Sequence, residues 1–224
     1  MKFKDLNYEK TTIISVTDAL IIVDIQNDFI PGGNLAVEGG DEIIDGINEL
    51  QDIFHSKNAR IVLTQDWHPL THKSFASVHK GKNPFDPHEE QGIGPILWPD
   101  HCIQGSKGAE FHPRLNVNHA KAILRKGFNP KIDSYSGFLE NDRNTQTGLS
   151  GYLKSCNISR IFICGLALDY CVYFTAIDGK KLGFDVYVIP ELSRGIDDPE
   201  NNILTTLEDM EKNGIKFIKT IDIK

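Results

Sequence analysis

The sequence predicts an α/β protein with a doubly wound, mainly parallel sheet of about six strands in one domain, residues 1–224. Short apolar runs rich in β-branched residues recur along the chain, and helix-length polar or amphipathic stretches separate most of them. The runs are continuously apolar rather than alternating, which indicates strands that are buried on both faces of a parallel sheet.

The individual elements follow from these two patterns. The predicted strands are Ala19 to Ile25, Arg60 to Thr64, Ala120 to Leu124, Arg160 to Gly165, Asp185 to Ile189 and Ile215 to Ile218. The predicted helices are Asp41 to Lys57, Gly148 to Cys156, Tyr170 to Lys181 and Pro199 to Lys212. Asp41 is the predicted N-cap of the first helix, and the last two helices end near Gly183 and Gly214.

Three stretches fit neither pattern. Met1 to Asp18 lacks the apolar segment of a signal peptide and is predicted to be a short lead-in to the first strand. Pro69 to Pro99 is crowded with His, Pro and Gly, and Asn129 to Asn144 is crowded with Ser, Tyr, Asp and Asn. Structureless segments of that length in a compact domain usually form lids or walls of a site, and we expect that role for both.

Composition and charge exclude several classes of function. The net charge is -7 and the basic residues are scattered, so nucleic acid is not an expected partner. The longest apolar runs are far shorter than the roughly 20 residues that span a bilayer, so no membrane partner is expected. The cysteines, Cys102, Cys156, Cys164 and Cys171, form no C-x-x-C pair, which favours a reducing cytoplasm over a disulfide framework.

Reactive residues follow four of the predicted strands. Asp24 lies at the end of the first strand, Asp66 and His68 follow the second, Lys126 the third and Cys171 the fourth. Ligands of open parallel sheets bind at the carboxyl ends of the strands. We therefore expect a carboxylate, a carboxylate with an imidazole, a lysine and a thiol to meet at one edge of the sheet.

Cys171 is the candidate nucleophile. It is predicted to lie in the first turn of a helix, where the helix dipole lowers a thiol pKa. Asp24 is a candidate proton acceptor and Lys126 a candidate counter-ion. The ordinary alternatives are a structural cysteine, a capping carboxylate and a solvated lysine. No histidine is close to these residues in sequence, which favours Asp-Lys-Cys over Cys-His-Asn chemistry but leaves a histidine brought near by the fold open. Cys164, inside an apolar strand, is expected to be structural.

Asp66 and His68 are candidate metal ligands. Alternate residues of an extended segment point to the same side, so the two could bind one ion of the Zn²⁺ type with open positions for water or substrate. His101 is the predicted third ligand. His72, His79 and His88 compete for that place, and the ordinary alternative is a set of surface histidines.

Aromatic residues flank these reactive groups. By default Phe29 and Trp98 are core or lid residues. Alternatively, their rings form the two sides of a pocket for a flat aromatic substrate. Gln26 is a further candidate substrate contact.

Taken together, these segments resemble the nicotinamidases of the isochorismatase-like hydrolase superfamily. The resemblance rests on Val23 to Phe29, Asp66 to Pro69, Trp98 to Cys102, Lys126-Gly127, Asp133 to Phe138 and Gly165 to Val172. These motifs occur in the family's order and spacing from Ala19 to Gly195, and as a set they are highly specific.

The resemblance implies a three-layer, Rossmann-like fold and hydrolysis of nicotinamide to nicotinate and ammonia in NAD salvage, with pyrazinamide as a further substrate. It implies a catalytic triad of Asp24, Lys126 and Cys171 that works through a thioester. It also implies a divalent ion on Asp66, His68 and His101 that orients the pyridine nitrogen. Zn²⁺ is the first choice, while Fe²⁺ and Mn²⁺ stay open. A small-molecule partner and a cytoplasmic location are expected, and a homo-oligomer stays open.

The resemblance further implies an oxyanion hole formed by the backbone N–H groups of Ala167 and Cys171, with a cis peptide bond between Leu166 and Ala167. Two departures from the family pattern stand out. Leu168 replaces a common threonine, which removes a hydroxyl but no backbone donor. The Pro69 to Pro99 loop matches the longer family members, and whether His72 is a fourth metal ligand stays open.

Two other functions remain as alternatives. The first is a related amidohydrolase that acts on a carbamoyl or ureido compound, although an ion that binds a ring nitrogen has no obvious use with an acyclic substrate. The second is a non-catalytic sensor that binds pyridines or metal. A sensor would not need a thiol, a lysine and a carboxylate together. Isochorismatases proper lack the nucleophilic cysteine that this chain has at Cys171.

Overall fold

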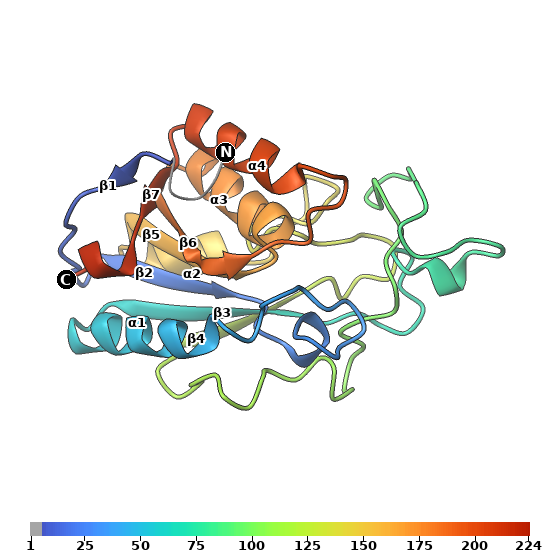
Figure 1. The fold of residues 1–224 in the computed structure, drawn as a ribbon, viewed down its shortest axis with the longest axis horizontal. Coiled ribbons are helices and arrows are strands. Elements are labelled where there is room, and N and C mark those ends of the chain that lie inside the picture. The colour runs from blue at the N-terminus through green and yellow to red at the C-terminus, as the bar shows by residue number, and fades with distance from the viewer. Residues whose placement is uncertain (1–5) are drawn as a thin grey trace.

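The computed structural model describes residues 6–224, and its centre is one parallel sheet of seven strands in the order β1-β7-β6-β5-β2-β3-β4 (Figure 1). The strands are β1 (Tyr8–Glu9), β2 (Asp18–Val23), β3 (Arg60–Asp66), β4 (Ala122–Lys126), β5 (Arg160–Leu166), β6 (Asp185–Arg194) and β7 (Lys216–Ile218). The predicted fold class is confirmed, since every strand pair is parallel.

The strand that was not predicted is β1, which lies in the stretch expected to be a lead-in. It consists of two residues and pairs with β7 at the edge of the sheet. Two residues carry no periodicity, so no sequence pattern could predict this strand. The part of the lead-in before residue 6 lies outside the described residues.

Helices cover both faces of the sheet. They are α1 (Ile44–Ser56), α2 (Leu149–Ser155), α3 (Tyr173–Lys181) and α4 (Asn202–Lys212). Figure 1 shows α1 on one side of the sheet and α3 and α4 on the other, which gives the three layers. Asp41 was predicted to cap α1, but the N-cap is Ile43 and it makes no side-chain cap hydrogen bond. Within the described residues, no helix is both long and apolar enough to span a bilayer.

The two long loops contain neither a strand nor an α-helix. Pro69 to Pro99 holds one short 3₁₀ turn, Ala76–Val78, and reaches well beyond the strands in Figure 1. Both loops pass the carboxyl ends of β3 and β4, and the amide of Lys73 bonds to the carbonyl of Pro130 between them. The carboxyl edge of the sheet is therefore enclosed by irregular segments.

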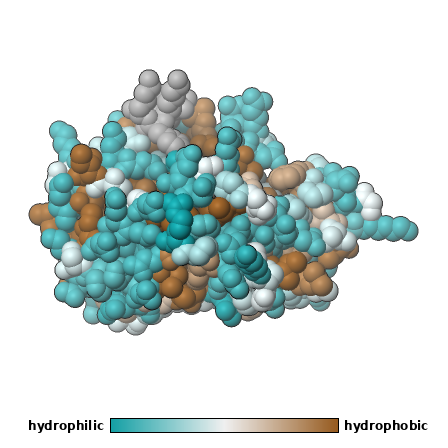
Figure 2. All heavy atoms as spheres, turned by 60° about the horizontal axis from the view of Figure 1, so that its bottom comes forward, coloured by the Kyte–Doolittle hydropathy of each residue, from teal (hydrophilic) through white to brown (hydrophobic). Residues whose placement is uncertain are grey.

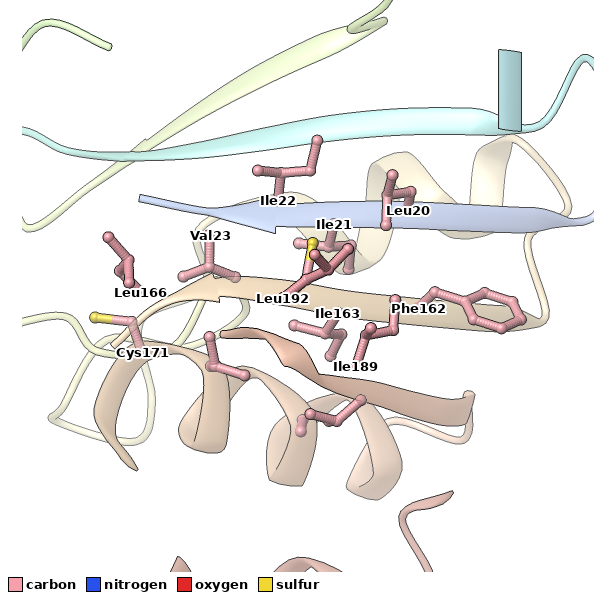
Figure 3. Packing of buried hydrophobic residues seen from close by; sticks show 14 of the residues in the cluster. Leu20, Ile21, Ile22, Val23, Phe162, Ile163, Leu166, Cys171, Ile189 and Leu192 are labelled. Atoms are coloured by element: carbon pink, nitrogen blue, oxygen red, sulfur yellow. The ribbon is translucent and has the colours of Figure 1, made fainter. Parts of the chain in front are cut away.

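The apolar core runs through the sheet up to this edge. Figure 3 shows β2 residues from Leu20 to Val23 packing beside Ile163 and Leu166 of β5, with Cys171 next to Leu166. Cys164 is fully buried in β5, as predicted for a structural cysteine. The surface is different: the face in Figure 2 is mainly hydrophilic, with separate hydrophobic patches.

Candidate active site

The predicted reactive residues lie together at the carboxyl ends of four parallel strands. Asp24 directly follows β2, Asp66 is the last residue of β3, Lys126 is the last residue of β4, and Cys171 lies in a π-helical turn after β5. All four side chains are buried, and the parallel register aligns Asp66 with Lys126. The carboxyl ends of the central strands therefore form a single cluster of ionisable groups.

Lys126 lies at the centre of this cluster. Its Nζ is 2.5 Å from Asp66 Oδ1, 2.9 Å from Asp24 Oδ2 and 3.4 Å from the Sγ of Cys171. It also donates to the carbonyl of Ser134 at 2.8 Å. Burial alone would lower the lysine pKa, but the two carboxylates outweigh burial and raise the pKa well above its ordinary value. One buried cation thus touches both acids and the thiol.

Asp24 is held by Thr64. The Thr64 hydroxyl donates to Asp24 Oδ1 at 2.6 Å and lies 3.2 Å from the backbone N–H of Asp24 as its acceptor. Burial raises the pKa of Asp24, while the charge of Lys126 opposes that shift. A carboxyl group with a raised pKa is better matched to accepting and returning a proton near neutral pH than an ordinary aspartate is.

The environment of Cys171 corrects one prediction. We expected a helix dipole to lower the thiol pKa, yet burial and the nearby carboxylates outweigh Lys126 and raise the pKa well above its ordinary value. The residue sits in a π turn with its side chain enclosed, so the desolvation of a thiolate dominates. The resting group is a neutral thiol, which needs a base. A carboxylate oxygen of Asp24 lies within 4.8 Å of Sγ.

The predicted metal ligands also come together. One ligand atom each from Asp66, His68 and His101 lie within 4.8 Å of one another, and all three residues are buried. His68 Nδ1 bonds to the carbonyl of Gly127 and His101 Nδ1 to the carbonyl of Pro99, both at 2.8 Å. A carbonyl can only accept, so Nδ1 carries the proton in each ring. The Nε2 atoms, 3.5 Å and 3.9 Å from Asp66 Oδ2, are then free to bind an ion.

The charges at this trio suit a divalent cation. Burial opposes the charge of Asp66, but Lys126 and the imidazoles outweigh it and hold the carboxyl pKa below its ordinary value. Burial lowers the pKa of His101 to about 4, so this ring is neutral at pH 7. Burial also opposes the charge of His68, yet Asp66 outweighs it and raises that pKa. A carboxylate with two imidazoles is a donor set typical of catalytic zinc and related ions.

The competing histidines do not belong to this trio. His72 Nδ1 is 2.7 Å from the Ser74 hydroxyl and its Nε2 is 3.2 Å from the carbonyl of Ile132, so both nitrogens are occupied. His79 Nε2 bonds to the carbonyl of Lys73, and His88 Nε2 lies 3.7 Å from Glu90 Oε2. His72 nevertheless lies beside His68, with ring centroids 4.3 Å apart and the rings tilted by 48°.

Gly127 has no room for a side chain beside His68. A Cβ on Gly127 would lie 2.4 Å from Cε1 and 2.7 Å from Nδ1 of the His68 ring. We expect Gly127→Ala to weaken divalent-metal affinity by about 10-fold or more, since it displaces a ligand through its supporting contact. Competition with a chelator measures the metal affinity of each variant. Gly81→Ala is the matched control, because Gly81 also has positive φ but nothing within 4 Å of its Cβ. Equal affinity in both variants would contradict the prediction.

A small cavity opens between the triad and the metal-ligand trio. Its lining residues are Phe29, Leu35, Asp66, Trp98, His101, Asp133, Tyr135, Ala167, Tyr170, Cys171 and Ile196. The predicted ring contacts Phe29 and Trp98 are both on its wall, and the Phe29 ring lies 5.5 Å from that of His101. Ala167 and Cys171, the expected oxyanion donors, also line it, and the Leu166-Ala167 peptide bond is cis.

Gln26 requires a correction, because it does not line the cavity. Its Nε2 donates to the carbonyls of Asp66 and Ala109, and its Oε1 accepts the N–H of Asp66. The side chain is fully buried and its amide is used by the backbone of β3 and a neighbouring loop. Gln26 therefore positions Asp66 instead of contacting a substrate.

Sequence reasoning missed several residues of the wall. Tyr135 accepts the indole N–H of Trp98 at 3.0 Å and donates to the carbonyl of Gly94 at 3.2 Å, which ties the two long loops together. Tyr170 packs edge-on against both rings. Tyr135 and Asp133 belong to a motif quoted for the family resemblance, so the signal was present, but the motif carries no chemistry that assigns either side chain to the cavity.

Comparison with known proteins places this geometry among characterised relatives. A family model described as the isochorismatase domain matches residues 18–222. A nicotinamidase from Acinetobacter baylyi is 48% identical over 205 residues, which are 92% of this chain and 94% of the relative. A nicotinamidase from Escherichia coli is 45% identical and covers 80% of this chain and 83% of its own length.

Solved structures agree with these relatives. A nicotinamidase and pyrazinamidase from Acinetobacter baumanii superposes with a TM-score of 0.88 at 47% identity, covering 92% of this chain and 98% of its own. The L. infantum protein PnC1, solved with nicotinate, has a TM-score of 0.83 at 38% identity and covers 96% and 99%. A Pyrococcus horikoshii pyrazinamidase, solved with zinc, has a TM-score of 0.75 at 38% identity and covers 91% and 99%.

Proposed function

Since the chain belongs to the isochorismatase family, we propose that the cavity at its strand ends is the site where it hydrolyses nicotinamide to nicotinate and ammonia. The chain is an amidohydrolase of NAD salvage, as its nicotinamidase relatives at 45% and 48% identity support. The A. baumanii relative is also named a pyrazinamidase, so we expect pyrazinamide to be deamidated too.

One observation carries the assignment of the site. Lys126 Nζ contacts the thiol of Cys171 and the carboxylates of Asp24 and Asp66 at once. The nucleophile Cys171 and two of the metal-ligand trio, Asp66 and His101, line one cavity, and the base Asp24 lies directly behind them on Lys126. A binding protein gains nothing from a buried thiol between a lysine and a carboxyl group. The arrangement supports nucleophilic acyl transfer.

The proposed reaction begins with proton transfer from the Cys171 thiol to Asp24, whose raised pKa suits it as the acceptor. The thiolate attacks the carboxamide carbon, and the backbone N–H groups of Ala167 and Cys171 receive the oxyanion. Asp24 returns the proton to the departing ammonia and a thioester remains. Asp24 then takes a proton from water, the hydroxide attacks the thioester carbon and the C–S bond breaks; Asp24 returns the proton to the Cys171 sulfur, and the product leaves as nicotinate after losing its acid proton to solvent. Lys126 keeps its charge throughout and balances the carboxylates.

The ligand trio fits one divalent ion. Asp66 supplies a carboxylate oxygen, and His68 and His101 supply Nε2 atoms whose rings are fixed through Nδ1. We choose Zn²⁺, with support from the zinc in the P. horikoshii structure, and leave Fe²⁺ and Mn²⁺ open. When bound, the ion would act as a Lewis acid that holds the pyridine nitrogen, directly or through water.

Ammonia release from nicotinamide by the purified protein tests the function. We expect rapid release that is lost after chelation and restored by adding a divalent ion, because the ring nitrogen then has its anchor again. Pyrazinamide serves as a second substrate and heat-denatured protein as the blank. If the metal-loaded protein released no ammonia, the proposed reaction would be wrong, and ureido and carbamoyl amides would be tested next.

The remaining expectations are part of the same proposal. We propose a cytoplasmic enzyme that forms a single domain over residues 1–224 and takes only small-molecule partners. The four free cysteines support a reducing compartment, and the family model covers nearly the whole chain.

A further inference from the structure

One carboxylate oxygen on the cavity wall has no hydrogen-bond partner among the described residues. Asp133 is 2% exposed and lines the cavity, and its Oδ2 is unpaired. Every other polar atom of the residue is bonded. Its N–H donates to the carbonyl of Gly92 and its carbonyl accepts the N–H of Asn141, both at 2.8 Å, while Oδ1 accepts the N–H of Ser134 at 2.9 Å. The residue is thus fixed from three sides with one acceptor left over.

Such an oxygen is costly unless a ligand supplies its donor. A buried polar atom without a partner costs about 1–3 kcal/mol, and more when it is charged. The neighbouring imidazoles cannot supply the donor. His68 directs its Nδ1 proton to Gly127, and both nitrogens of His72 face Ser74 and Ile132.

The position of Asp133 favours the metal side of the cavity over the thiol side. Its carboxylate lies within 4.8 Å of ligand atoms of His68 and His72, whereas Cys171 groups with Asp24 and Asp66. Asp133 does not belong to the group formed by Asp66, His68 and His101, whose ligand atoms all lie within that distance of one another. Asp133 forms a second such group with His68 and His72, so it lies close to the metal site without belonging to the ligand trio.

We propose that Asp133 is a positioning residue whose Oδ2 accepts a hydrogen bond from a water molecule on the divalent ion held by Asp66, His68 and His101. Three protein ligands leave open positions that water and substrate share. A fixed acceptor at one of them orients the bound water and so helps to decide which position the ring nitrogen takes. This inference rests on the metal site of the proposed function.

Asp133→Asn isolates the atom in question. The asparagine carbonyl can still accept the Ser134 N–H, and the two backbone hydrogen bonds do not involve the side chain. The change therefore replaces the Oδ2 acceptor by an NH₂ donor and removes the carboxylate charge, and the control variant must remove a buried carboxylate charge as well. Glu140→Gln is the matched control: Glu140 is on the same loop, is also 2% exposed and also has an unpaired oxygen, but it does not line the cavity.

The experiment compares Zn²⁺ affinity of wild type, Asp133→Asn and Glu140→Gln by chelator competition. The visible spectrum of the Co²⁺-loaded proteins reports on coordination, and thermal unfolding in chelator checks the metal-free fold. We expect Asp133→Asn to bind Zn²⁺ about 10- to 100-fold more weakly with an altered Co²⁺ spectrum, and Glu140→Gln to match wild type.

Several outcomes would overturn the inference. Unchanged Zn²⁺ affinity in Asp133→Asn would refute it, and if KM for nicotinamide rose at the same time, Oδ2 would serve the substrate instead. An equal loss in Glu140→Gln would show a general effect of buried carboxylates. If wild type bound neither ion, the metal part of the proposed function would fail along with this inference, whereas ammonia release would still test the thiol chemistry separately.

Discussion

Cys171→Ala should lower the rate of nicotinamide hydrolysis by about 10⁴-fold or more, because the nucleophile of the proposed acyl transfer is lost. The remaining groups would still bind substrate and stabilise an oxyanion, but the attacking atom would have to be water. A coupled assay of ammonia release over hours measures such a low residual rate. Zn²⁺ affinity should stay within a few-fold of wild type, since the proposed ligands are Asp66, His68 and His101 and all three remain.

Cys164→Ala is the control for this prediction. Cys164 is also buried and lies in the strand that leads to Cys171, yet its thiol has no role in the proposed chemistry. We expect nearly full activity, with a modest loss of thermal stability from the missing sulfur. Turnover by Cys171→Ala at a tenth of the wild-type rate or above would exclude a thioester.

Lys126→Met should lower both stability and activity by large amounts. Removing the cation leaves Asp24 and Asp66 buried close together without their counter-ion. Breaking a buried ion pair in this way costs about 3–5 kcal/mol. Denaturant unfolding in the presence of chelator measures the loss. Ammonia release should fall to the background rate, because Asp24 would then hold its proton too tightly to act as a base.

The pH dependence of this loss has a defined sign. Without Lys126, the pKa of Asp24 in the folded protein lies still further above that of the unfolded chain, so folding takes up a proton. The loss in free energy of unfolding of Lys126→Met relative to wild type is therefore largest at neutral pH. It shrinks as the pH falls toward about 4, where the carboxylates of the unfolded chain take up protons. Lys121→Met, at an exposed lysine just before β4, should show no such trend. A pH-independent deficit, or one below about 1 kcal/mol, would mean that Lys126 is not the essential counter-ion.

Six of the seven strands could be predicted from the sequence because burial leaves a direct trace in composition. A strand such as β2, with every residue buried, is apolar from Ala19 to Val23, and the polar Asp24 that follows then stands out. The parallel arrangement does the rest, since it brings such residues to one edge without any further information. Asp24, Lys126 and Cys171 could therefore be placed together before any coordinates existed.

Other features depend on contacts that no local pattern encodes. The role of Gln26 is decided by backbone atoms of Asp66 and Ala109, which come from two distant segments. The raised pKa of Cys171 depends on how completely the loops close over it, and helix position alone gave the opposite sign. Asp133 reaches the cavity through bonds to Gly92 and Asn141, partners that only the folded loops provide.

The two carboxylate oxygens of Asp66 contact different groups. Oδ1 bonds to Lys126 of the triad, while Oδ2 faces the imidazoles of His68 and His101. A single carboxylate thus joins two centres, and their binding free energies are linked. Linkage of this kind is reciprocal, so a group bound on the thiol that changes metal affinity must see its own affinity changed by the same factor when metal is added. Occupancy of one centre can therefore be read by titrating the other.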